Sequence, residues 1–148
     1  MTTVTQTIVS GTDDTLMSSD LNTLASGASV VSSVAGASGV ITLTSAGYIE
    51  GELELVCTST SNMTANTTVL VWFLRAPDGT NYEDGSSSVT PTRNPDVTFS
   101  MRAANSQRIT KRCKLPPGPF KVLLQQNSGQ AFLSANTLKA KPYTNQFA

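Results

Sequence analysis

The sequence predicts an all-β protein whose antiparallel strands form a two-sheet sandwich or a barrel. The β-formers Val and Thr are abundant, whereas the long side chains that favour helices are sparse. Seven or eight short segments alternate apolar and polar residues, which is the period-two pattern of half-buried strands. Polar connections rich in Gly, Pro, Ser and Asn separate these segments, and 148 residues is the usual length of one domain.

The N-terminal segment, residues 1–20, is predicted to be an arm. Residues 1–9 have an extended pattern, but the pattern is too short and too isolated to secure a strand in the core. Asp20 can cap one helical turn, which glycines soon end. Two short apolar stretches follow in a region rich in Ser, Ala and Gly, at residues 29–34 and 40–43.

Two strands are predicted in the middle of the chain. From Tyr48 to Cys57, apolar residues alternate with three glutamates, so one face of this strand is dry and the other wet; the glutamates are Glu50, Glu52 and Glu54. The next strand, residues 68–75, is apolar on both faces. We therefore expect it to be central, with a second layer or another subunit on its outer side.

The rest of the chain is predicted to contain a turn, a long polar stretch and further strands. Pro77 and Gly79 supply the backbone angles of a turn in residues 76–80. The predicted strands that follow are at 97–103, 108–113, 120–125 and 136–141. Three prolines between 115 and 119 exclude that segment from a central strand. The sandwich is expected to span 21–141, leaving 142–148 as a C-terminal tail.

Seven side chains are expected to be almost fully buried, either in the core or, on the two-faced strand 68–75, against another subunit. Their positions follow from the alternation along each strand. They are Leu53, Leu55, Val71, Trp72, Phe99, Val122 and Leu124.

The charges are distributed unevenly along a chain whose net charge is zero. The net charge is −6 over residues 1–74, −2 over 75–96 and +8 over 97–148. A basic C-terminal third could bind nucleic acid, but it lacks the interleaved aromatic residues that stack on bases. We expect instead that the glutamate row lies alongside the basic residues of 108–114 and 139–141, where opposite charges compensate.

The sequence predicts a protein with no catalytic site, cofactor or metal. It contains no histidine, which excludes Ser-His-Asp and Cys-His catalysis. Glu83 and Asp84 beside Tyr82 are the one carboxylate pair on a loop, but adjacent residues of an extended chain point apart. The oxygens of 78–81 do not follow the spacing of a calcium loop, and no glycine-rich phosphate motif is present.

Cys57 and Cys113 are expected to be free thiols, because their spacing indicates neither a zinc site nor a disulfide framework. No stretch has the apolar length of a membrane span, and the N-terminus lacks the features of a signal peptide. We therefore expect synthesis in a cytoplasm.

The aromatic residues argue against an exposed sugar-binding platform. Four of them fall at core-like positions: Trp72, Phe73, Phe99 and Phe120. Five others remain candidates for exposed contacts: Tyr48, Tyr82, Phe132, Tyr143 and Phe147.

Several blocks resemble a family of small virion proteins of tailed bacteriophages. In chain order they are Leu21–Gly27 (LNTLASG), Val71–Gly85 (VWFLRAPDGTNYEDG), Leu115–Leu124 (LPPGPFKVLL), Gly129–Phe132 (GQAF) and Asn136–Leu138 (NTL). The family's usual LRS-like sequence before the DGT turn is Leu74-Arg75-Ala76 here, a small departure. The resemblance implies a jelly-roll-like sandwich that decorates the outside of the phage head in many copies. It further implies the major capsid protein and other copies of this chain, as a dimer or trimer, as partners.

The two ends of the chain are the expected docking residues, because they carry apolar side chains outside any strong core pattern. These residues are Val4, Ile8, Val9, Tyr143 and Phe147. We expect neither nucleic acid nor a membrane as a partner. Two other functions stay open, a tail or neck component and a glycan-binding module on the virion exterior, because a fold alone does not determine a function.

Overall fold

The computed structural model describes residues 6–33, 39–43 and 50–147, and it describes side chains within 11–143 of these ranges. Nine strands and one short 3₁₀ turn make up the regular structure of these residues. They are β1 (Gln6–Ser10), β2 (Asp14–Met17), η1 (Ser19–Leu21), β3 (Ser29–Val31), β4 (Glu50–Thr58), β5 (Thr68–Arg75), β6 (Val97–Ser100), β7 (Ser106–Lys114), β8 (Phe120–Gln126) and β9 (Thr137–Phe147).

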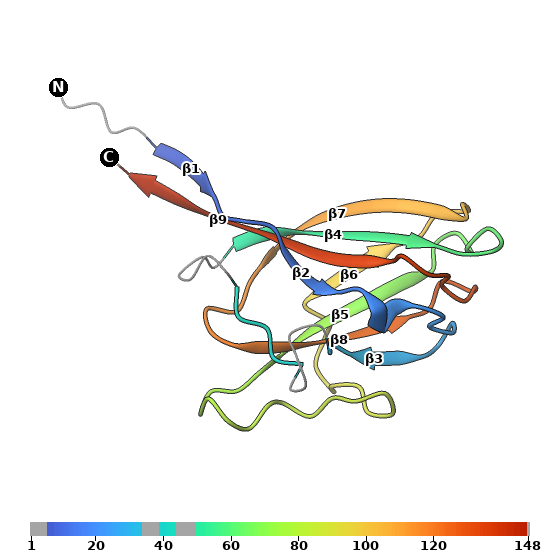
Figure 1. The fold of residues 1–148 in the computed structure, drawn as a ribbon, viewed down its shortest axis with the longest axis horizontal. Coiled ribbons are helices and arrows are strands. Elements are labelled where there is room, and N and C mark those ends of the chain that lie inside the picture. The colour runs from blue at the N-terminus through green and yellow to red at the C-terminus, as the bar shows by residue number, and fades with distance from the viewer. Residues whose placement is uncertain (1–5, 34–38, 44–49, 148) are drawn as a thin grey trace.

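The strands form two antiparallel sheets packed as a sandwich, as the sequence predicts (Figure 1). The first sheet has the order β1-β9-β4-β7, with β2 also paired to β9; the second has the order β3-β8-β5-β6. The pairs β2/β9, β3/β8, β4/β7 and β5/β6 show that the chain is one long hairpin rolled up on itself. This is the arrangement of a jelly roll, and it brings the two ends of the chain together.

The core between the sheets is built from the inward residues of each strand. Six of the seven predicted core residues are fully buried there: Leu53, Leu55, Val71, Phe99, Val122 and Leu124, each 0% exposed. Phe73 and Phe120 meet edge to face with ring centroids 5.3 Å apart. The seventh predicted residue, Trp72, is also buried, at 4% exposed, but on the outer face of the second sheet.

That outer face is covered by a long loop of the same chain, residues 76–96, which we call the covering loop. Trp72, Leu74 and Leu123 form a second apolar cluster under it. A methyl group at Gly85 would lie 2.8 Å from Leu74 Cδ1, so the backbone of the loop packs closely against β5 at this glycine. The two-faced β5 is therefore covered by a second layer, one of the two alternatives that its sequence predicts.

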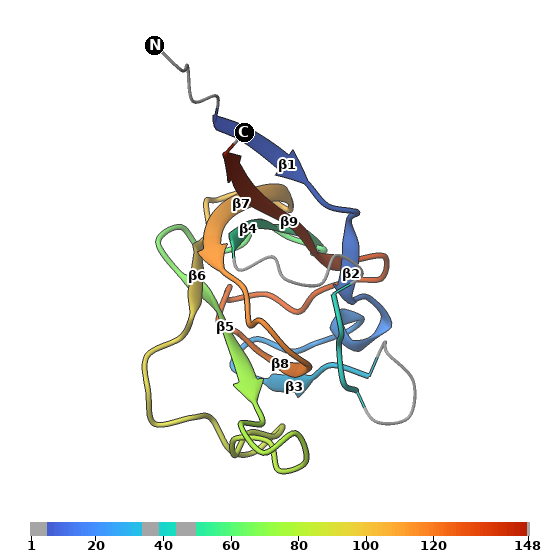
Figure 2. The same ribbon diagram turned by 90° about the vertical axis from the view of Figure 1, so that its left-hand side faces the viewer.

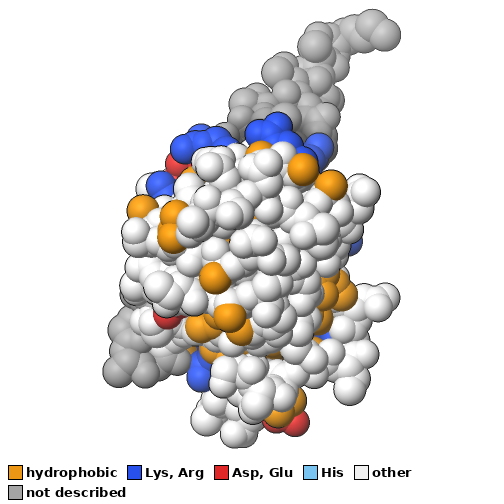
Figure 3. All heavy atoms as spheres, turned by 90° about the vertical axis from the view of Figure 1, so that its right-hand side faces the viewer, with side chains coloured by type: hydrophobic (Ala, Val, Ile, Leu, Met, Phe, Trp, Pro, Cys, Tyr) orange, Lys and Arg blue, Asp and Glu red, His pale blue; other side chains and the backbone are white. Residues whose placement is uncertain are grey.

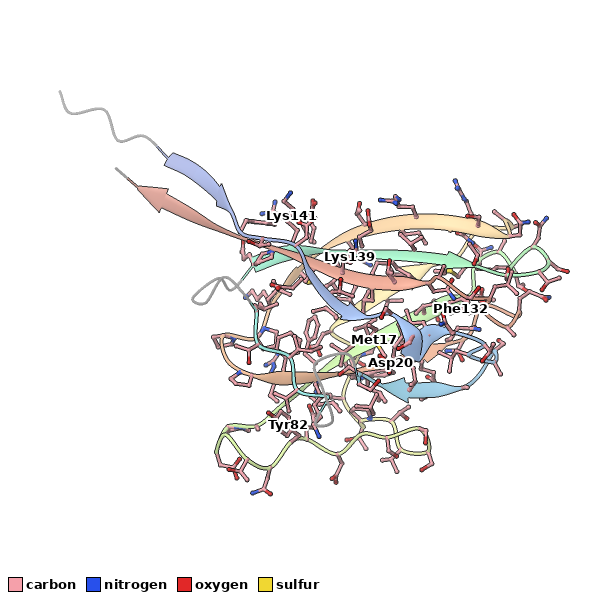
Figure 4. All side chains as sticks on the ribbon, in the orientation of Figure 1. Met17, Asp20, Tyr82, Phe132, Lys139 and Lys141 are labelled. Carbon is pink, nitrogen blue, oxygen red and sulfur yellow. The ribbon has the colours of Figure 1, made fainter. Side chains whose placement is uncertain are left out.

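The first sheet includes residues on both sides of the predicted domain boundaries. Leu16 and Met17 of β2 are 0% exposed, so this part of the 1–20 segment packs in the core. β9 continues through Pro142, within the segment 142–148 that we expected to be a tail. Figure 4 shows Met17 beneath this sheet, on the side that faces the core.

Buried amide side chains hold the loops at one end of the sandwich. Asn136 accepts a hydrogen bond from the Thr58 backbone N–H and donates to the carbonyl oxygens of Leu21 and Leu133. Phe132, which we expected among the exposed aromatic residues, is 1% exposed. That expectation was wrong because this loop folds inward, with the Phe132 N–H donating to the Leu24 carbonyl.

Candidate docking surface

The two ends of the chain pair with each other and form a ribbon that projects from the sandwich (Figures 1 and 2). We call this the terminal ribbon: β1 paired with Tyr143–Phe147 of β9, in a register that runs from Gln6↔Phe147 to Ser10↔Tyr143. It brings together four of the five predicted docking residues, Ile8, Val9, Tyr143 and Phe147. The fifth, Val4, lies outside the described residues.

The ribbon leaves the sandwich where Gly11, Gly51 and Pro142 lie side by side. The Gly11 N–H donates to the Pro142 carbonyl over 2.7 Å, so the ring nitrogen of Pro142 also faces β1. Because Pro142 has no N–H, one hydrogen bond between β9 and β1 is lost. The pairing between β9 and β4 at Gly51 is not affected. Glycine is needed at position 51 because a methyl group there would lie 2.7 Å from the Lys141 carbonyl oxygen.

Tyr143 connects the base of the ribbon to β7. Its hydroxyl accepts a hydrogen bond from Arg112 Nε, and the guanidinium carbon lies 5.1 Å from the ring centroid. This hydrogen bond, followed by the nearby Glu50, raises the pKa of Arg112 above its ordinary value. Tyr143 is half-buried and also sits opposite Glu50 in the register between β9 and β4.

The outer face of the first sheet is a set of three charged rows, which we call the charged face. The acidic row on β4 is flanked by one basic row on each neighbouring strand. The acidic row is Glu50, Glu52 and Glu54, and the basic rows are Arg108, Arg112 and Lys114 on β7 and Lys139 and Lys141 on β9. Figure 4 shows Lys139 and Lys141 on β9, and Figure 3 shows basic side chains gathered toward the ribbon.

Cross-strand register pairs opposite charges on this face. Glu52 sits opposite Arg112 on one side and Lys141 on the other, and Arg108 Nη1 lies 2.8 Å from Glu54 Oε2. Lys141 Nζ also lies 3.7 Å from Asp13 Oδ1, across a groove of about 220 Å³. The expectation that the glutamate row lies alongside the basic residues is confirmed.

The covering loop is held by one arginine, Arg93, whose partners lie within the loop and on β5. Arg93 Nε and Nη2 donate to the two carboxylate oxygens of Glu83 over 2.7 and 2.9 Å, and Nη1 donates to Asp96 over 2.8 Å. Arg93 Nη2 also donates to the Phe73 carbonyl, which ties the loop to β5. The hydrogen bonds from Arg93 to Glu83 are the largest cause of its raised pKa.

These contacts give the acidic residues of the loop structural partners. Glu83 is bound at both oxygens by Arg93, while Tyr82 stacks under Lys121, whose Nζ lies 4.8 Å from the ring centroid. Asp78 accepts the backbone N–H groups of Thr80 and Asn81, and these bonds lower its pKa to about 2. Tyr82 lies on the covering loop in Figure 4, at the edge of a polar cavity of about 480 Å³.

Both cysteines are free in the structure. Burial raises the pKa of the Cys57 thiol to about 11 and that of the Cys113 thiol to about 12. A low thiolate fraction makes both groups poor nucleophiles at neutral pH. Within the described residues, no three side chains of the metal-binding types come together, and no helix has the length and apolar character to cross a bilayer.

The ribbon and Arg93 show what sequence reasoning missed. The pairing of residues 6–10 with 143–147 has no local signal, because each segment alone is a short extended stretch. Gly51 did carry a signal, since glycine within a strand often marks a close backbone approach. Arg93 lies in a polar stretch where no periodicity identifies its partners.

Two of the blocks that carry the resemblance to phage virion proteins, the first and the fourth, meet in space. The Gly129 N–H donates to Ser26 Oγ, and the Gly27 N–H donates to the Gln126 carbonyl. The first block thus packs against the fourth, across more than a hundred residues of chain. Comparison of the sequence with protein-family models and with curated proteins finds no match.

Proposed function

We propose that this protein is a non-enzymatic virion structural protein that binds the outside of a phage head and stabilises contacts between major capsid protein subunits. The observation that carries the proposal is the terminal ribbon, in which both chain ends leave the sandwich together. A projecting ribbon can reach a neighbouring surface while the sandwich stays folded, since β1 pairs only with β9 among the described strands. The resemblance of the sequence blocks to small phage virion proteins supports the same function.

The charge pattern also supports a protein that binds protein rather than nucleic acid. The charged face places each basic row beside the acidic row, so its three glutamates and Asp13 offset most of the five basic charges that could otherwise bind phosphates. At the end opposite the ribbon few charged side chains are exposed, as Figure 3 shows.

The stabilising mechanism is multivalent. Packaged DNA pushes the shell outward, and a protein that bridges neighbouring capsomers adds contacts that must break before the shell opens. Each contact can be weak, because copies held on one shell benefit from high effective concentration.

A binding experiment with heads assembled without this protein tests the proposal. The full chain should co-sediment with the heads, and a variant lacking residues 1–10 and 144–148 should lose binding while keeping its far-UV circular dichroism. This truncation spares Leu16 and Met17, which belong to the core. Binding at full affinity by the truncated protein would refute the role of the ribbon.

A matched control changes exposed apolar residues far from the ribbon. Val89 and Leu133 are 49% and 44% exposed, and a variant with alanine at both should bind heads as the unmodified protein does. Counting copies in purified particles by mass spectrometry then separates the locations. A copy number that scales with the capsomers supports decoration, whereas one that matches a single ring contradicts it and places the protein in the tail or neck.

A further inference from the structure

We propose that β1 uses its free edge to pair with β1 of a second copy of this chain, in an antiparallel dimer whose two-fold axis passes beside Ile8. Such pairing would join two terminal ribbons into one continuous sheet, β9-β1 of one copy followed by β1-β9 of the other. The inference goes beyond the proposed function, because it concerns a contact between copies that forms without a phage head.

The hydrogen-bonding direction of β1 follows from its junction with β9. The Gly11 N–H bonds to the Pro142 carbonyl, and hydrogen-bonded pairs alternate along an antiparallel ladder. Val9 and Thr7 therefore bond to β9, whereas the backbone groups of Ser10, Ile8 and Gln6 point away from it. Among the described residues no strand pairs with this outer edge.

The other sheet edges carry features that block strand addition, and β1 does not. β7 has its basic row, and Lys111 donates to the Thr98 carbonyl on the edge of β6. β3 is only 3 residues long, and the pairing of β2 shifts register between Thr15 and Met17. Gln6–Ser10 contains no charge, no proline and no register shift, which are the usual protections of an edge.

The composition of β1 favours a second copy as the occupant. In antiparallel self-pairing centred on Ile8, each residue whose backbone groups point away from β9 lies opposite another such residue. Ile8 lies opposite Ile8 of the second copy, and Gln6 lies opposite Ser10. Every outward N–H and C=O then has a partner, and no like charges are brought together because the strand is uncharged. Two-fold dimers of this isologous kind are the commonest oligomers. A strand pair of this length buries little surface, so we expect the dimer to dissociate on dilution.

Sedimentation of the full chain measures the association directly. We expect the apparent mass to rise toward that of a dimer with increasing concentration. A monomer at every concentration up to the solubility limit would overturn the proposal. That result would also be obtained if this edge paired only with a strand of the capsid protein.

Charge variants test whether Ile8 lies on the axis. Ile8→Lys alone and Ile8→Glu alone should each abolish dimerisation, because like charges would sit directly opposite. An equimolar mixture of the two should recover a dimer that contains one chain of each. A dimer that survives either single change, or a mixture that stays monomeric, would refute this register. Thermal unfolding followed by circular dichroism checks that each variant keeps its sandwich.

A cysteine pair provides a matched control for register. Oxidised Ile8→Cys should form a disulfide-linked dimer, since directly opposite residues are within disulfide range. Val9→Cys should not, because position 9 faces position 7 of the second copy. Equal cross-linking of both variants would contradict the register. A dimer that fails to bind heads would refute only the proposed function, and a monomer that binds heads would refute only this inference.

Discussion

Truncating Trp72 to alanine should destabilise the protein by roughly 3 kcal/mol, the lower end of the usual cost for a buried aromatic residue. The side chain is 4% exposed and packs with Leu74 and Leu123 under the covering loop. Its indole N–H donates to the Arg93 carbonyl over 3.1 Å, a bond that contributes about 1 kcal/mol. We expect the lower end because a loop can close over a cavity more readily than two packed sheets can.

Urea unfolding followed by far-UV circular dichroism measures this cost, and two further variants resolve its parts. Trp72→Phe keeps a ring but loses the hydrogen bond, so it should cost about 1–2 kcal/mol. Val89→Ala, on the same loop but 49% exposed, should change the free energy of unfolding by less than about 0.5 kcal/mol.

Fluorescence provides an independent check, because Trp72 is the single tryptophan. Emission of the folded protein should be blue-shifted and should move to longer wavelength on unfolding. If Trp72→Ala lowers the free energy of unfolding by less than about 1 kcal/mol, no more than Val89→Ala does, the reasoning is refuted. It would place the indole on the surface, where it could serve as a sugar-binding platform.

Four other predictions concern the first sheet and the thiols. Replacing the three β4 glutamates by glutamine should create duplex DNA binding that weakens steeply with salt, measured by fluorescence anisotropy, whereas the unmodified protein should not bind. Gly51→Ala should lower the free energy of unfolding by about 1–3 kcal/mol in urea, because its methyl group would overlap the Lys141 carbonyl. Native Cys57 and Cys113 should react with a thiol reagent at pH 8 far more slowly than after unfolding. Because folding raises the Cys57 pKa from 9.0 to about 11, the free energy of unfolding should be unaffected below pH 9 and fall as pH rises through that interval.

The strands and the core could be predicted because alternation is a local signal. In β4, glutamates alternate with Leu53 and Leu55, and this pattern determines both the conformation and the buried face. The charge asymmetry carried longer-range information. A row of like charges on one strand requires compensation nearby, and the register of β4 with β7 and β9 provides it.

The ends of the first sheet could not be predicted, because they depend on partners distant in sequence. The sequence predicts that the last strand ends at Lys141, before Pro142, yet β9 continues to Phe147. Proline lacks a backbone donor, and whether that loss matters in a strand depends on which neighbour the ring nitrogen faces. At Pro142 it faces Gly11 near the opposite end of the chain, which no local pattern indicates.

The covering loop was missed for a related reason. Its sequence is polar and rich in turn residues, which is typical of an exposed connection. Its position depends on Arg93, which bridges Glu83 and Asp96 and reaches the Phe73 carbonyl. None of these contacts follows a helical or strand period, so the sequence indicated only that something must cover β5.

The rolled hairpin also determines the order in which the strands can pair during synthesis. β9 follows the other strands of the sandwich in the sequence and is made after them, yet it lies inside the first sheet, between β4 and the N-terminal strands. Until β9 has been made, β1 and β2 lack the strand with which they pair, and β4 has only β7. Folding must then close the loop from β1 to β9, which makes this step slow compared with local pairing. A chain that stops before β9 would lack the terminal ribbon, and with it the surface through which we propose that the protein binds a head.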